Sequence, residues 1–336
     1  MPWRALPGER PDPYRVWLSE VMLQQTTVAA VKPYFERFLH RFPTVEALAA
    51  AGQDEVMEAW AGLGYYARAR NLHACARRVA DMGGFPSDVE GLRELPGIGA
   101  YTAAAVAAIA FERPVVPVDG NVERVVSRVF AVTDPLPGSR PQLAAAAARL
   151  GADPQARDRP SDFAQALFDL GATICTPANP ACAMCPWRDD CAARRLGVAS
   201  ELPRKAPKAV RPLRHGAHFW LQDRHGRVLL RRRPSSGLLG GMLELPGTPW
   251  RAEGWDREEA MRWAPAAAEW RLAGHATHGF THFELQMDVY AATVRTIEAG
   301  DGLLRDLDAL AAEALPTAMR RCVRIALAAG QASRSP

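Results

Sequence analysis

The chain has 336 residues, a length that corresponds to about two domains of ordinary size. Hydrophobic residues make up 48% and charged residues 23%, a balance typical of globular proteins that excludes a disordered chain. No apolar run reaches the roughly 18 residues of a membrane-spanning helix, and the first residues lack the apolar stretch of a secretion signal. We therefore expect a cytoplasmic protein with no membrane partner.

The basic residues are unevenly distributed. Residues 1–200 carry 21 basic and 22 acidic side chains, whereas residues 204–233 carry ten basic side chains and one acidic side chain. Such a stretch could lie along a polyanion, and the alternative is a solvated linker and hairpin.

The first part of the chain has the pattern of a helical domain. Apolar residues recur at helical spacing, as at Val16, Trp17, Val21 and Met22, over residues 14–198. Glycines and prolines between these segments leave helices of about 8–14 residues. No alternating strand pattern occurs before residue 210, and residues 201–212, with three prolines, predict an extended linker.

Strand patterns follow the linker. Residues 218–221 and 227–230 are apolar and flank the turn sequence Asp-Arg-His-Gly, which indicates a hairpin. Residues 283–290 alternate like a half-buried strand, and residues 303–315 and 317–329 predict helices. The sequence thus predicts an all-α domain over 1–198, a basic linker over 199–213 and a smaller α+β domain over 214–336.

The six cysteines predict a metal centre. Cys75 and Cys322 are isolated and are expected in the core, whereas four others follow the spacing C-x6-C-x2-C-x5-C: Cys175, Cys182, Cys185 and Cys191. Only one pair forms the short knuckle of a zinc site, so the longer loops favour a [4Fe–4S] cluster, with zinc as the alternative. This spacing resembles the cluster loop of the endonuclease III and MutY superfamily of DNA glycosylases.

A glycine-rich turn precedes an alanine-rich helix. In residues 95–102 (LPGIGAYT), Pro96, Gly97 and Gly99 could expose backbone N–H groups to one phosphate without reading a base. An ordinary helix–helix turn is the alternative. Together with the cysteine loop, the segment resembles the helix–hairpin–helix of base-excision glycosylases.

Two carboxylates occupy contrasting positions. Asp119 directly precedes a predicted helix, where N–H donors and the helix dipole favour an anion, although aspartate is also an ordinary cap. Glu20 lies among apolar groups, which would keep it protonated near neutral pH unless its side chain is simply exposed. An acid and an anion of this kind can cleave a glycosidic bond through an oxocarbenium-like transition state.

Several segments then resemble MutY-type adenine DNA glycosylases, a family that removes adenine mispaired with 8-oxoguanine. They are residues 18–26 (LSEVMLQQT), 61–68 (AGLGYYAR), 95–102 and 118–122 (VDGNV), with the cysteine loop. The resemblance implies that Glu20 protonates the adenine and that Asp119 stabilises or traps the sugar cation, with Tyr101 and Asn121 positioning these groups.

The resemblance also implies a DNA-binding surface. Gln24, Gln25 and Tyr65 would fill or wedge the duplex after the base is flipped. Three further residues match positions that line the adenine pocket: Trp3, Arg4 and Asp169. The alternatives are that Tyr65 and Trp3 are core aromatics, that Gln24 and Gln25 form a polar helix face, and that Asp169 is a surface charge. Relatives have a helix upstream of Met1 that helps to line the base pocket, and its loss would expose apolar surface and reduce stability or activity. Relatives also have basic residues within 176–181, where this chain has no charge, so we expect phosphate contacts to be weaker or to shift to Arg188, Arg194 and Arg195.

The second domain resembles a degenerate Nudix domain. Residues 237–247 match the opening of that fold, but the best candidate for its metal-binding carboxylates, at Arg257, lacks the second acidic pair. Phe280, Thr281 and His282 match the family's Phe-Ser-His loop, which implies recognition of 8-oxoguanine, although His278 and His282 could simply flank a strand. The expected protein is a mostly α helix–hairpin–helix glycosylase domain plus an α+β Nudix-like domain.

Tyr101 distinguishes two branches of the superfamily. The endonuclease III branch has a lysine there, which forms a Schiff base and cuts the strand, and tyrosine cannot do this. We therefore expect a monofunctional enzyme. The resemblance implies that it acts on double-stranded DNA with A:8-oxoG or A:G mispairs, and we expect it to be a monomer. The alternatives are a bifunctional endonuclease III-like glycosylase/lyase and a non-enzymatic iron–sulfur DNA-binding protein.

Overall fold

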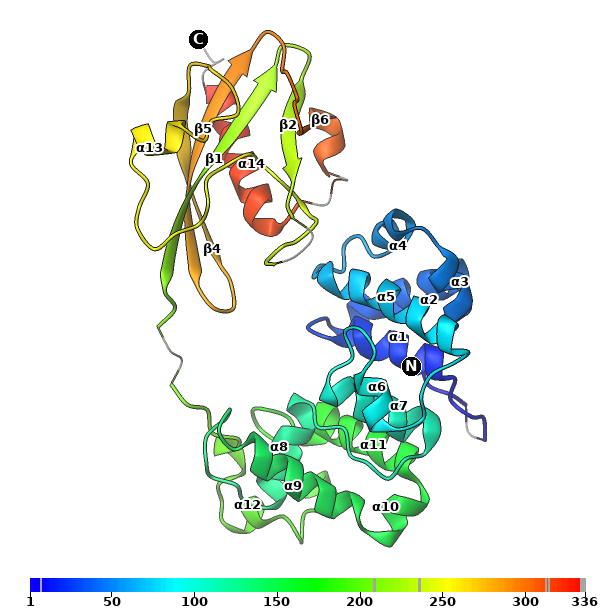
Figure 1. Ribbon diagram of the computed structural model, residues 1–336. Coiled ribbons are helices and arrows are strands. Elements are labelled where there is room, and N and C mark those ends of the chain that lie inside the picture. Colours follow the sequence, from blue (N-terminus) through cyan, green and yellow to red (C-terminus); the bar gives the residue numbers. More distant parts are fainter. Residues whose placement is uncertain (7, 208–209, 235–236, 312, 314, 333–336) are drawn as a thin grey trace. The chain divides into compact units, whose positions relative to one another are not determined.

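The computed structural model describes residues 1–6, 8–207, 210–234, 237–311, 313 and 315–332. The chain separates into two compact units, Met1–Pro207 and Lys208–Pro336 (Figure 1). Among the described residues, no helix is long and apolar enough to cross a membrane.

The first unit is helical, as the sequence predicts, and no strand precedes residue 213 in the described part of the chain. Its helices range from four to sixteen residues, so the predicted range of 8–14 was too narrow. They are α1 Pro13–Leu23, α2 Val28–Arg41, α3 Val45–Ala50, α4 Gln53–Ala59, α5 Ala67–Met82, α6 Val89–Arg93, α7 Ala100–Phe111, α8 Gly120–Val129, α9 Arg140–Gly151, α10 Pro154–Asp158, α11 Pro160–Asp169 and α12 Ala192–Arg195.

Two hydrophobic cores hold this unit together. The larger core is built mainly from α1 to α7 around fully buried rings such as Trp17, Phe35 and Trp60. The smaller core joins α8, α9 and α11 through Val125, Leu143 and other apolar side chains. Burial of such side chains contributes roughly 1.5–3 kcal/mol each, so these contacts fix the helices whose ends carry the polar groups described below.

Local signals set the helix ends that matter for the site. Asp12 caps α1 by accepting from the Tyr14 amide, and Pro13 occupies the first turn. Between α6 and α7, Gly97 has a φ of +75°, and a Cβ there would lie 2.6 Å from the Asn71 Cβ. Gly99 is the N-cap of α7 and offers no side-chain cap, so the first N–H groups of α7 face outward without an internal side-chain acceptor.

The second unit is a mixed sheet with helices on its faces (Figure 1). The strand order is β3-β2-β1-β5-β4, with β6 paired to β2; β1 and β5 are parallel and the other neighbours antiparallel. α14 packs on β4 and β5 and closes one core, while the other face is covered around Trp270 and α13. The elements are β1 Leu213–Asp223, β2 Arg227–Arg232, β3 Leu243–Glu244, α13 Arg257–Met261, β4 Arg271–Gly279, β5 Glu284–Val294, β6 Leu303–Asp306 and α14 Thr317–Ala332.

The strand predictions hold, and one helix prediction is wrong. The hairpin forms between β1 and β2, and β5 alternates between exposed and buried residues. The helix predicted over 303–315 is instead the strand β6 followed by a short 3₁₀ helix, Leu307–Ala311. Leu303 and Leu304 pair with Leu230 and Leu229 of β2, a long-range contact that overrides the local helical pattern.

Candidate active site

The first unit contains a cavity of about 420 Å³ where α1, α7, the start of α8 and the end of α11 meet. This volume lies in the range of ordinary small-molecule sites. Its lining includes both predicted catalytic carboxylates, Glu20 and Asp119, and both residues predicted to position them, Tyr101 and Asn121. Side chains 99 residues apart in the sequence therefore face one shared space.

Glu20 is held as a buried carboxyl on α1. Glu20 is 7% exposed, and the Tyr101 hydroxyl donates a hydrogen bond to the Glu20 Oε2 at 2.6 Å. Burial raises the pKa of Glu20 from 4.5 to about 7; the Tyr101 hydrogen bond lowers it, the charge of Asp119 raises it and that of Arg4 lowers it. Burial raises the pKa of Tyr101 as well, so its hydroxyl stays protonated and continues to donate.

Asp119 has a very different environment at the N-terminus of α8. Its Oδ1 accepts from the backbone amides of Asn121 at 2.9 Å and Val122 at 2.7 Å. Its Oδ2 accepts from the Asn121 side-chain amide at 3.0 Å. Three donors and the helix dipole therefore stabilise a negative charge beside the cavity.

Arg124 links this carboxylate to the cysteine loop, a connection that the sequence does not reveal. Its guanidinium donates to the Asn121 Oδ1 at 2.8 Å, the Gly171 carbonyl at 2.6 Å and the Cys175 carbonyl at 2.7 Å. An arginine on an amphipathic helix gives no sequence signal of such partners, because two of the three are backbone oxygens about 50 residues away.

The predicted adenine-pocket residues also line the cavity. Arg4 and Asp169 form a two-pronged ion pair, with both N–O distances at 2.7 Å, and Trp3 packs edge-on against Phe35 with ring centroids 5.5 Å apart. Trp3 is thus both a core contact and a cavity wall. Phe168, which the sequence interpretation missed, lines the same cavity with its ring 6.1 Å from that of Tyr101.

The three residues predicted to wedge the duplex lie at or next to non-glycine residues with a positive φ. Gln24 and Gln25 line the cavity, and Gln25 has a φ of +57°. Tyr65 has a φ of +50°, and the residue is 61% exposed, which excludes the alternative that it is a core aromatic. Left-handed backbone at non-glycine residues is costly and is concentrated at functional sites.

Four cysteine thiols surround a second cavity in this unit. Cys175, Cys182, Cys185 and Cys191 all line it, and Arg128 donates to the Cys175 Sγ at 3.3 Å. In the described part of the chain, no three His, Cys, Asp or Glu side chains gather closely enough to hold one metal ion. The other two cysteines, Cys75 and Cys322, are buried in the cores, as the sequence predicts.

In the second unit, the predicted 8-oxoguanine loop is the turn between β4 and β5. The Phe280 amide donates to the Phe283 carbonyl at 2.8 Å, which closes the turn and leaves Thr281 and His282 exposed at its tip. His278 lies within β4, so the two histidines do flank a strand end.

Comparisons with known proteins agree with this arrangement. Residues 18–147 match the HhH-GPD superfamily of base excision DNA repair proteins, and residues 217–324 match the NUDIX domain. The Homo sapiens adenine DNA glycosylase is 35% identical, over 97% of this chain and 71% of the relative. That of Mycolicibacterium smegmatis is 45% identical, over 55% of this chain and 65% of the relative. A thermostable thymine-DNA glycosylase structure is 30% identical with a TM-score of 0.49, over 57% of this chain and 89% of that chain.

Proposed function

Because this chain belongs to the adenine DNA glycosylases, hydrolases that act on N-glycosyl bonds in base-excision repair, we propose that it removes adenine paired with 8-oxoguanine or guanine without cutting the DNA strand. The observation that carries the proposal is the shared cavity, which joins a buried carboxyl of pKa about 7 to a carboxylate with three donors. DNA is the partner, and the flipped adenine is the occupant we assign to the cavity.

Glu20 acts as the general acid in this proposal. With a pKa of about 7 it is protonated in a substantial fraction of molecules at neutral pH and can give its proton to a ring nitrogen of adenine. The electron pair of the glycosidic bond then leaves with the base. The Tyr101 hydroxyl, already donating to Glu20 at 2.6 Å, stabilises the carboxylate that remains.

Asp119 stabilises the positive charge that develops on the sugar, or traps it as a covalent adduct before water attacks. Its three donors hold the carboxylate in place, and two of them come from Asn121. Water then adds its oxygen to the sugar carbon and releases a proton, which completes hydrolysis and leaves an abasic site.

Strand cleavage is not expected, because a lyase step needs an amine that attacks the sugar. No lysine occurs among the residues that line the cavity, and the hairpin position that carries a lysine in bifunctional relatives is Tyr101. The product of this enzyme is therefore an intact strand with an abasic site.

DNA engagement is assigned to two groups of residues on the first unit. The turn at Pro96, Gly97 and Gly99 presents the uncapped N-terminus of α7 to a backbone phosphate. The space that the flipped adenine leaves in the duplex is filled by Gln24, Gln25 and Tyr65. The flipped adenine itself is enclosed by Trp3, Arg4 and Asp169.

We assign the four-cysteine cavity to a [4Fe–4S] cluster. All four cysteines line one space, and the loops of six and five residues between them suit a cluster, which is larger than one ion. Cys175, Cys182, Cys185 and Cys191 would hold the cluster, which contributes a folded loop next to α8. Arg124 and Arg128 connect that loop to the helix that carries Asp119.

The second unit supplies recognition of the opposite base. We assign contact with 8-oxoguanine to Phe280, Thr281 and His282, because two of these side chains stand exposed on a closed turn. Residues 1–198, 199–213 and 214–336 thus serve as glycosylase domain, linker and recognition domain of a monomer that acts on the bacterial chromosome in the cytoplasm.

The test offers the protein a labelled duplex with adenine opposite 8-oxoguanine, followed by alkali to cleave abasic sites. The wild type should release adenine and show cut strands only after alkali, and borohydride should trap little covalent complex. Glu20→Gln should bind the duplex without releasing adenine, whereas Glu36→Gln, an exposed glutamate on α2, should behave as wild type. Full activity in Glu20→Gln, or efficient cutting without alkali, would refute the proposal.

A further inference from the structure

The recognition turn of the second unit rests on an aromatic platform. The Phe280 ring lies 5.6 Å from that of Trp250 and 4.8 Å from that of Phe283, and His278 packs edge-on against Phe280 at 4.7 Å. The two phenylalanines point inward while Thr281 and His282 between them point to solvent. The position of the Thr281–His282 tip therefore depends on the contacts that fix the Trp250 ring.

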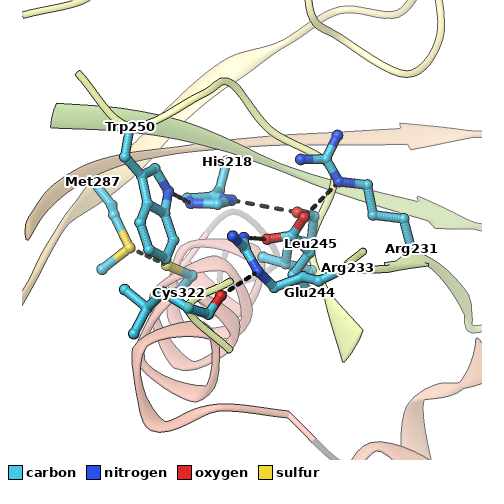
Figure 2. Close-up of polar contacts among 9 residues, drawn as sticks. His218, Arg231, Arg233, Glu244, Leu245, Trp250, Met287 and Cys322 are labelled. Carbon is cyan, nitrogen blue, oxygen red and sulfur yellow. Dashed lines mark hydrogen bonds and ion pairs between the residues drawn. The ribbon is translucent and has the colours of Figure 1, made fainter. Parts of the chain in front are cut away.

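Trp250 is fixed at its nitrogen by a buried histidine (Figure 2). Its indole Nε1 donates to the His218 Nε2 at 3.3 Å, while the other ring nitrogen of His218 faces the Leu245 carbonyl at 3.3 Å. The carbonyl can only accept, so His218 must donate through Nδ1 and accept through Nε2, which defines a single neutral tautomer. Burial lowers the pKa of His218 to about 4, consistent with this neutral form.

A second constraint acts on the face of the indole. The Arg233 guanidinium lies 4.8 Å from the centre of the Trp250 ring and forms an ion pair with the buried Glu244, which also accepts from Arg231 (Figure 2). An arginine whose charge is paired on one side and whose plane covers an indole on the other has little freedom to move.

Two glycines allow the backbone to approach the Trp250 and His218 rings closely. A Cβ on Gly216 would lie 2.7 Å from the Trp250 ring, and a Cβ on Gly247 would lie 2.6 Å from the His218 Nδ1. Both positions must remain glycine for the histidine and tryptophan to pack as they do.

We propose that Trp250, clamped between His218 and Arg233, is a positioning residue that sets the Thr281–His282 tip for recognition of 8-oxoguanine. The inference rests on the proposed function, in which this tip reads the base opposite adenine. Trp250 belongs to the second unit and does not line the cavity assigned to adenine in the first, so its loss should reduce discrimination between mispairs and leave the excision chemistry of the first unit unchanged.

The experiment measures single-turnover adenine excision from A:8-oxoG and A:G duplexes and takes the ratio of the two rates. Trp250→Leu should lower this ratio about tenfold, with the A:G rate within twofold of wild type. Trp250→Phe, which keeps a ring against Phe280 but loses the indole donor, should have an intermediate ratio. Trp263→Leu is the matched control, because Trp263 is 46% exposed and its recorded ring partner is Trp255.

Two outcomes overturn the inference: an unchanged ratio in Trp250→Leu, or an equal fall of both rates, which is what a merely structural role would give. If Trp250→Leu does not fold, Arg233→Gln provides the same test of the clamp. A double variant, Thr281→Val with His282→Ala, separates the two levels. An unchanged ratio there refutes base reading by the tip, whereas a reduced ratio there with a normal ratio in Trp250→Leu refutes only the clamp.

Discussion

The pH dependence of adenine excision provides a direct test of Glu20 as the acid. A carboxyl with a pKa of about 7 is protonated in about half of the molecules at pH 7, compared with about 0.3% at its ordinary value of 4.5. If this proton is transferred in the slow step, the single-turnover rate should be constant at lower pH and fall as the pH rises through about 7.

Tyr101→Phe should shift this profile in a defined direction. The Tyr101 hydroxyl stabilises the ionised form of Glu20 and lowers its pKa, so removing the hydroxyl should raise it. A hydrogen bond worth about 0.5–1.5 kcal/mol corresponds to a rise of about 0.4–1.1 pH units. The midpoint of the alkaline fall should therefore move from about 7 to about 7.4–8.1, even if the maximum rate decreases.

The assay is single-turnover excision from an A:8-oxoG duplex between pH 5 and 9, with enzyme in excess. Tyr14→Phe is the control, because that hydroxyl also donates a buried hydrogen bond, to the Phe42 carbonyl at 2.8 Å, but does not line the cavity. A midpoint near 4.5 in the wild type, or a downward shift in Tyr101→Phe, would show that the titrating acid is not Glu20.

Three further predictions concern stability and the connections of the site. In urea titrations, Glu20→Gln should be more stable than the wild type at pH 8 by up to about 3 kcal/mol, and equally stable below pH 4.5. The reason is that the folded wild type holds the Glu20 proton more tightly than the unfolded chain does. The wild type therefore loses stability as the pH rises from 4.5 through about 7. Arg124→Gln loses contacts to Asn121 and Cys175 and should reduce both the excision rate, roughly tenfold, and the iron content measured on the purified protein. Arg68 donates to the carbonyls of Met22 and Leu63, so Arg68→Met should slow base flipping about three- to tenfold, measured by the fluorescence of 2-aminopurine in the adenine position.

Some parts of the site could be predicted because they depend on short stretches of sequence. Asp119 is recognisable because a cap is a local feature, set by an aspartate directly before a helix. The burial of Glu20 follows from apolar neighbours at helical spacing on α1.

Other parts depend on contacts between distant segments and could not be predicted. Arg124 donates to the distant Cys175 carbonyl and Arg68 to the distant Met22 carbonyl, and an arginine in a helix looks the same in sequence whether it binds such groups or faces water. Strand β6 was predicted as helix for a related reason, because only its pairing with β2 decides its conformation. The clamp on Trp250 combines His218 of β1 with Arg233, which directly follows β2, and these residues form no local motif with Trp250.

The hydrogen-bond environments of Glu20 and Asp119 differ, and this difference supports their proposed roles more strongly than the presence of either carboxylate alone. Glu20 has a single hydroxyl donor and little solvent, so ionising it leaves a charge with few compensating groups. Asp119 accepts hydrogen bonds from three N–H donors, an environment that complements a negative charge. The reverse assignment, with Asp119 as acid and Glu20 as anion, would therefore oppose the hydrogen bonding at both sites. In the proposed mechanism, the different donors around the two carboxylates therefore assign the proton to Glu20 and the stabilising negative charge to Asp119.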